Sequence, residues 1–230
     1  IMKRIGFLVN PIAGMGGRVG LKGTDNVVKE AIMRGAKPIA GVKAAETLAT
    51  FLESCKKYDF KLPVRWLTCS GKMGAEIFEN LSFKKEYYEI VYNCREETTA
   101  EDTKKACKTF LEQHANLILF CGGDGTAKDV YDIVGRKIPI LGIPAGVKMH
   151  SGVFGVNTKT VAEILIEFLN DMLTINDVEI LDLDEEKYRS GEWAIELYGI
   201  AKTPYEPSYI QGGKMMIEEQ TEEDVKEDIA

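Results

Sequence analysis

The residues with the clearest chemical meaning form one short run after an apolar segment. Residues 117–121 are Leu-Ile-Leu-Phe-Cys, and residues 122–126 are Gly-Gly-Asp-Gly-Thr. Glycines let the backbone turn tightly and approach a ligand closely, and the free N–H groups at the start of a helix favour anionic oxygens. The run therefore predicts a phosphate site. Its expected contacts are Gly122, Gly123, Gly125 and Thr126.

Asp124 lies inside this run and needs its own explanation. A carboxylate among phosphate-binding amides would repel the phosphates, so its presence makes sense only if the reaction uses it. It could accept a proton from an attacking hydroxyl, or it could help to hold Mg²⁺. Asp124 is therefore the candidate catalytic residue, and a metal-linked role is the alternative. The purely structural interpretation is an aspartate that caps the following helix.

A second glycine-rich loop follows the first apolar segment, residues 4–9. Residues 10–17 are Asn-Pro-Ile-Ala-Gly-Met-Gly-Gly. Such a loop offers an amide-rich concavity at a strand end, which suits a triphosphate. A dinucleotide-binding fingerprint would need glycine at position 19, where Val19 stands, so a Rossmann dehydrogenase is disfavoured. The predicted nucleotide contacts of this loop are Asn10, Gly14, Gly16 and Gly17.

Together these loops resemble the superfamily that unites NAD kinases with diacylglycerol and sphingosine kinases. The resemblance is closest to the ATP–NAD kinase-like family that includes the AcoX proteins, and it covers residues from about 3 to 217. It is carried by residues 10–17, 117–126 and 140–156. It implies a phosphotransferase in which Asp124 is the base or a metal-linked residue. The donor would be ATP or polyphosphate, with Mg²⁺, and the 2′-hydroxyl of NAD would be the leading acceptor.

The segment after the next apolar run departs from both kinase groups. NAD kinases usually carry a GxNxGxLGF-like segment there and lipid kinases a PxGTxND-like one, but residues 144–155 contain neither asparagine. We therefore expect a different acceptor-reading surface, with Lys148, His150 and Ser151 as candidate contacts. A kinase of a lipid or another small alcohol stays open, and so does a nucleotide-binding regulator without turnover. His150 could also be a satisfied structural histidine.

The elements that must position these residues alternate between strands and helices. Strands are expected at residues 4–9, 64–69, 89–94, 117–121 and 138–143, and helices at about 25–34, 42–57, 73–81, 100–113, beyond 126 and 161–169. This alternation predicts a Rossmann-like α/β fold with an open, mostly parallel sheet and helices on both faces.

The pattern changes near residue 175, where two strands at 178–183 and 193–201 follow without a helix between them. We therefore predict a nucleotide-binding domain over residues 3–175 and part of a β-rich second domain over 176–230. We also expect the polypeptide to continue beyond Ala230, because the amphipathic pattern at the end is too short for a helix that stands alone.

Composition excludes several classes of function. The chain has 230 residues and a net charge of −7, most of it in residues 218–230, so the remainder is nearly neutral. It lacks the basic surface that nucleic-acid binding requires. Its apolar runs are far shorter than the roughly 20 residues of a membrane-spanning helix. No secretory signal is visible, so we expect a cytoplasmic protein, and we expect a homo-oligomer whose partners are a nucleotide and a small-molecule substrate.

Overall fold

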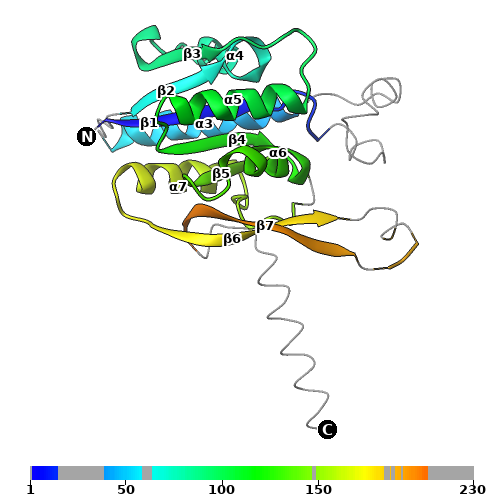
Figure 1. The fold of residues 1–230 in the computed structure, drawn as a ribbon. Helices are drawn as coiled ribbons and strands as arrows, with labels where there is room; N and C mark the ends of the chain where they lie inside the picture. The colour runs from blue at the N-terminus through cyan, green and yellow to red at the C-terminus, as the bar shows by residue number, and fades with distance from the viewer. Residues whose placement is uncertain are drawn as a thin grey trace.

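The chain folds around one parallel sheet. A computed structural model describes residues 2–14, 39–58, 64–146, 149–183, 187, 190–192 and 194–206. Five strands follow the order β3-β2-β1-β4-β5, and every neighbouring pair is parallel (Figure 1). Their bounds are β1 (Lys3–Val9), β2 (Val64–Cys69), β3 (Tyr88–Tyr92), β4 (Leu117–Gly122) and β5 (Ile140–Pro144). The predicted Rossmann-like α/β fold is confirmed.

Helices cover both faces of this sheet. On one face α3 (Ala40–Lys57) packs beside α7 (Thr158–Leu169), with the short α4 (Ala75–Asn80) nearby. On the opposite face α5 (Ala100–Glu112) packs beside α6 (Asp124–Val134). No helix among these is long and apolar enough to cross a membrane. The helix expected at residues 25–34 lies outside the described residues.

The central strands β4 and β5 are apolar throughout because both of their faces are buried, whereas the edge strand β3 exposes Glu89 and Ile90. Along β1, Ile5, Phe7 and Val9 enter the hydrophobic cluster under α3 and α7, whereas Leu8 enters the cluster under α5 and α6. Side chains of a strand alternate between faces, so a strand covered on both sides has no polar face. Gly6 lies against the ring of Phe110 from α5, which a larger residue would displace.

Polar side chains set where two of the helices begin. Asp102 accepts a hydrogen bond from the backbone N–H of Thr99 at 2.9 Å, which closes a capping box at the start of α5. At the start of α7 the N-cap Asn157 accepts from the N–H of Thr160 at 2.9 Å, and the Thr160 hydroxyl accepts the N–H of Asn157 at 3.1 Å. Such boxes satisfy N–H groups that have no partner within the helix.

The region predicted as one helix over residues 73–81 is divided in the structure. A 3₁₀ turn at Gly71–Met73 precedes α4, and Gly74 separates the two. Gly74 has φ 162° and ψ −50°, outside the helical region, and a Cβ atom there would lie 2.1 Å from the Thr68 hydroxyl oxygen, so a larger residue would not fit. A second 3₁₀ turn, Lys85–Tyr87, leads into β3.

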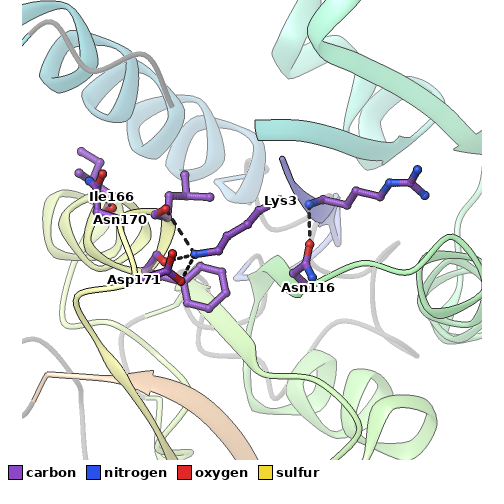
Figure 2. A network of polar contacts seen from close by, with 8 residues as sticks. Lys3, Asn116, Ile166, Asn170 and Asp171 are labelled. Carbon is purple, nitrogen blue, oxygen red and sulfur yellow. Dashed lines mark hydrogen bonds and ion pairs between the residues drawn. The ribbon is translucent and has the colours of Figure 1, made fainter. Parts of the chain in front are cut away.

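The amino-terminal edge of the sheet is fixed by polar contacts (Figure 2). The ammonium group of Lys3 donates to the carbonyl oxygen of Phe168 at 2.9 Å and pairs with Asp171, so it caps the end of α7. The backbone N–H of Arg4 donates to the side-chain oxygen of Asn116 at 2.7 Å. A cation at a helix end is favourable because the last carbonyl groups lack partners. This edge is therefore occupied by structural contacts.

The last described strands form an antiparallel ribbon. β6 (Thr174–Leu183) pairs with β7 (Ile195–Tyr205), which confirms the predicted change from parallel to antiparallel pairing. Ile180 and Ala201 of the ribbon belong to the same hydrophobic cluster as the α5–α6 side of the sheet. The ribbon is thus packed onto the sheet layers, and the domain boundary at 175/176 stays a prediction.

Two glycine substitutions test this packing. A Cβ atom at Gly6 would lie 2.6 Å from Cδ2 of the fully buried Phe110, whereas one at Gly41 in α3 meets no described atom within 4 Å. We expect Gly6→Ala to lower the free energy of unfolding by about 1–3 kcal/mol through overpacking. Gly41→Ala should raise it by roughly 0.5–1 kcal/mol, since alanine is the better helix former. Urea unfolding measures both, and equal midpoints for the two variants would contradict the described packing.

Candidate active site

The strand order places the two glycine-rich loops side by side. β1 lies between β2 and β4; α3, the next described helix after β1, covers one face, and α6, which follows β4, covers the other. In open α/β sheets, ligands bind at the carboxyl ends of the strands where the strand order reverses. Residues 10–14 and the β4–α6 junction both lie at that point. Sequence alone predicted the two loops separately, and the topology brings them together.

Direct hydrogen bonds join these loops. The backbone N–H of Asn10 donates to the carbonyl oxygen of Cys121 at 2.9 Å, and its side-chain amide donates to the Thr126 hydroxyl at 3.0 Å. The N–H of Ala145, after β5, donates to the carbonyl oxygen of Gly122 at 3.0 Å. The Thr126 side chain is buried by these neighbours. Both predicted nucleotide-contact side chains, Asn10 and Thr126, therefore pin the loops to one another.

Two of the predicted glycines are required by packing. Gly14 has a φ of +79°, and a Cβ atom there would lie 1.9 Å from the carbonyl oxygen of Ala145. A Cβ atom at Gly122 would lie 2.4 Å from the Thr126 hydroxyl oxygen. The fold itself explains both glycines, because any larger residue would separate the loops.

Gly123 and Gly125 differ from this pair. A Cβ atom at Gly123 would make only ordinary contact with Met149, at 3.7 Å, and one at Gly125 would meet no described atom within 4 Å. Gly123 has φ −112° and ψ −168°, an extended conformation open to other residues. Packing among the described residues does not require a glycine at either position, so both leave room for a ligand beside the first turn of α6. Gly16 and Gly17 lie outside the described residues.

Asp124 is the first residue of α6, and its carboxylate faces the loop that follows β5. One oxygen, Oδ2, accepts the backbone N–H of His150 at 2.9 Å, and the other, Oδ1, accepts the N–H of Ser151 at 2.9 Å. Nδ1 of the His150 ring lies 3.3 Å from Oδ2. The carboxylate thus holds a loop 26 residues farther along the chain.

The same contacts determine the charge of Asp124. Burial by itself raises the pKa of the carboxyl group, but the hydrogen bonds from His150 and Ser151 outweigh it and the net pKa is lowered. Each hydrogen bond to the ionised form stabilises that form. Asp124 is therefore ionised at neutral pH, although only 17% of its side chain is exposed.

The loop held by Asp124 is also tied to the ribbon. Ser151 is fully buried, and its hydroxyl oxygen accepts the N–H of Leu181 at 3.0 Å, next to an irregularity in the β6–β7 register. The N–H of Gly152 donates to the carbonyl oxygen of Glu179 at 2.8 Å. Ser151 therefore joins the loop to β6, and its role as a substrate contact stays a prediction. Lys148 lies outside the described residues.

Sequence reasoning missed how Asp124 is used. It identified Asp124, His150 and Ser151 as separate candidates and did not pair the carboxylate with the loop amides. The spacing of 26 and 27 residues carries no periodic signal that could have shown the pairing. Only the position of Asp124 at the start of a helix, across a short gap from the end of β5, brings them together.

The described residues do not supply a set of protein ligands for Mg²⁺. No three His, Cys, Asp or Glu side chains among them gather where they could hold a metal ion. Both carboxylate oxygens of Asp124 already accept backbone N–H groups. Mg²⁺ often binds through substrate phosphates and water, so a magnesium ion that accompanies a nucleotide needs no such set. The metal-linked role of Asp124 stays a prediction.

Comparison with known proteins assigns the family. No curated protein matches the chain. A crystal structure from Mycobacterium smegmatis in complex with β-D-fucofuranose matches with a TM-score of 0.32 and 11% identity, over 86% of this chain and 91% of that one. A likeness this weak supports no argument about fold or ligand. The family model for the ATP-NAD kinase N-terminal domain matches residues 5–173, which include both glycine-rich loops, Asp124 and the loop that it holds. The chain therefore belongs to the ATP-NAD kinase family.

Proposed function

We propose that the protein is a kinase that transfers a phosphoryl group from ATP to a hydroxyl group, with the 2′-hydroxyl of NAD as the leading acceptor. The observation that carries this proposal is the juxtaposition at one strand-order reversal. Two glycine-rich loops meet there beside an ionised carboxylate that contacts a histidine. The family supports a kinase-type transferase that binds a nucleotide. NAD as acceptor, ATP as donor and closeness to AcoX proteins are parts of the proposal.

The phosphates of the donor would lie at the first turn of α6. The N-cap residue Gly123 has no side chain to cap this helix, so its first backbone N–H groups would be available within the described part of the chain. The positive end of the helix dipole adds to their attraction for an anion. Gly123 and Gly125 leave the space that close approach of phosphate oxygens requires. Mg²⁺ would be carried by the phosphates themselves, where it neutralises part of their charge.

The protein's part in the reaction would be positioning and proton transfer. In-line phosphoryl transfer needs the acceptor oxygen aligned with the γ-phosphorus, and fixing that geometry can supply much of the rate enhancement. The amides of α6 would stabilise charge on the transferred group. The Asp124–His150 pair would help to remove the proton of the acceptor hydroxyl. The loop around residue 150, anchored by Asp124, would contact the acceptor.

A transfer assay tests the proposed reaction. We expect the full chain with Mg²⁺ and ATP to convert NAD to NADP, with one ADP released for each NADP. Parallel reactions would replace ATP by polyphosphate, and NAD by a diacylglycerol dispersion or a small polyol. Transfer to a lipid or polyol but not to NAD would favour the alternative acceptors. ATP binding without transfer to any acceptor would favour a nucleotide-binding regulator.

A second prediction separates ligand-facing glycines from structural ones. A Cβ atom at Gly123 makes only ordinary contact, so we expect Gly123→Val to fold with at most a small loss of stability, from valine at the N-cap, and to bind ATP at least tenfold more weakly by calorimetry. Gly122→Ala should instead lower the midpoint, because its Cβ atom would lie 2.4 Å from the Thr126 hydroxyl oxygen.

Ala100→Val is the matched control for Gly123→Val. It places the same valine side chain at the first turn of α5, an exposed position that follows the edge strand β3. Its ATP affinity should equal that of the parent. A folded Gly123→Val protein with parental affinity would remove the phosphate site from the first turn of α6.

A third prediction concerns Asp124 and pH. Asparagine can accept only one of the two loop amides and turns an NH₂ group toward the other, so Asp124→Asn should cost about 1–3 kcal/mol of stability at pH 7. The pKa of Asp124 is lowered from its ordinary value of 3.8, so its ionised form stabilises the fold above that pH. This contribution disappears as the pH falls through the folded pKa. The difference in the free energy of unfolding between variant and parent should therefore be largest at pH 7 and become smaller below pH 3.8.

Turnover distinguishes a catalytic from a purely anchoring Asp124. We expect the kcat of Asp124→Asn to be roughly 10²- to 10⁴-fold lower than that of the parent. Ser151→Ala removes the hydrogen bond between the loop and Leu181 but keeps the carboxylate, so it serves as the control for a loosened loop. If Ser151→Ala lost as much turnover as Asp124→Asn, loop anchoring would account for the whole effect.

A further inference from the structure

His150 approaches Asp124 through its ring as well as through its backbone. Nδ1 lies 3.3 Å from the Asp124 oxygen Oδ2. An ionised carboxylate can only accept hydrogen bonds, so this contact requires the proton of the neutral ring to be on Nδ1. Nε2 then holds a lone pair and can accept a proton. Among the described residues Nε2 has no hydrogen-bond partner.

Asp124 is poorly placed to be the proton acceptor itself. Its two oxygens already take the N–H groups of His150 and Ser151, and Oδ2 also faces the His150 ring. Burial raises the pKa of Asp124, but these hydrogen bonds lower it by more, so the carboxylate holds a proton weakly. A better base at neutral pH is an imidazole that a carboxylate orients, as in the Asp–His pairs of hydrolases.

The position of the loop fits this role. Asp124 begins α6, and residues 149–151 cross the start of that helix, with Met149 beside Gly123 and His150 against Asp124. The His150 side chain is 18% exposed, so its ring is neither fully buried nor free in solvent. The proposed phosphate site is at the same helix start. A hydroxyl that attacks a phosphoryl group held there would approach from the side of this loop.

We infer that His150 is the general base of the proposed kinase reaction and that Asp124 is the residue that orients it. The inference rests on the proposed function. Nε2 of His150 takes the proton of the acceptor hydroxyl while that oxygen forms its bond to the γ-phosphorus of the nucleoside triphosphate. The bond between the γ-phosphorus and the β–γ bridging oxygen breaks, and its electron pair leaves with the nucleoside diphosphate. The imidazolium then releases its proton to solvent.

The first arm of the test measures turnover. His150→Ala removes the ring but keeps the backbone N–H that binds Asp124, so the loop stays anchored. With MgATP and the acceptor that the transfer assay identifies, we expect kcat to fall by roughly 10²–10⁴. The KM for ATP should stay within a few-fold of the parental value. Added imidazole should raise the kcat of the variant at least tenfold. A merely structural histidine would not respond to imidazole.

The control is the chain's other histidine, His114. It follows α5 with a φ of +56°, which asparagine tolerates well. It precedes Asn116, whose side chain binds Arg4 at the amino-terminal edge of the sheet, opposite the proposed site. We expect His114→Asn to fold and to keep parental kcat.

The second arm does not depend on turnover. In the His114→Asn protein a single histidine remains, so ¹⁵N NMR of the ring reports His150 alone. We expect the neutral ring to carry its proton on Nδ1. In the same protein with Asp124→Asn added, the tautomer should shift toward the usual Nε2–H form, because an amide no longer requires a donor.

Each arm can overturn the inference. A His150→Ala protein with kcat within fivefold of the parent, or a loss that imidazole does not restore, would exclude His150 as the base. A His150 ring protonated on Nε2 would exclude orientation by Asp124. If the parent transfers phosphate to none of the acceptors, the proposed function fails and this inference fails with it. Parental transfer combined with either negative arm removes the inference alone.

Discussion

The hydrogen bonds between the Asp124 carboxylate and the amides of His150 and Ser151 fix the candidate site. They connect the start of α6 to the loop after β5, two segments that the sheet brings near one another but does not join there. Since the carboxylate is ionised and buried, it needs these donors, and the loop amides need an acceptor. Each group satisfies the other, so the loop conformation and the charge of Asp124 depend on one contact.

Further contacts hold the loop around residue 150 on two sides. Ser151 carries the constraint onward to Leu181, and the ribbon that contains Leu181 shares a hydrophobic cluster with α5 and α6. On the other side of the loop, Gly14, which follows β1, lies directly against the carbonyl oxygen of Ala145, which follows β5. The loops after these two strands are therefore packed against each other there. The loop around residue 150 therefore depends on the antiparallel ribbon as well as on the parallel sheet, although the family match ends at residue 173, before β6 begins.

The sheet and its described helices were predictable because β4 and β5 are apolar on both faces and the long helices carry regular apolar stripes. β4 and the glycine-rich run after it indicated a phosphate site for the same local reason, and that site stays a prediction. The division near residue 73 could not be predicted, because it depends on the non-helical backbone of Gly74, which packs against Thr68 of β2. The pairing of Asp124 with residues 150 and 151 likewise arises from tertiary contact. Local sequence identified the participants, and only the fold could assign their contacts.

The orientation of the Asp124 carboxylate also explains how an acidic residue can occur among amides that are proposed to bind phosphate. Repulsion between Asp124 and a triphosphate would be severe if the carboxylate pointed at the phosphates. Its oxygens instead face the loop, where two N–H groups offset part of the negative charge. Gly123, the N-cap of α6, offers no side-chain cap, so among the described residues the first N–H groups of α6 would be open to the proposed phosphates. The charge thereby acts on the neighbouring imidazole, which it can hold in one tautomer, while the glycines on either side leave the helix end open.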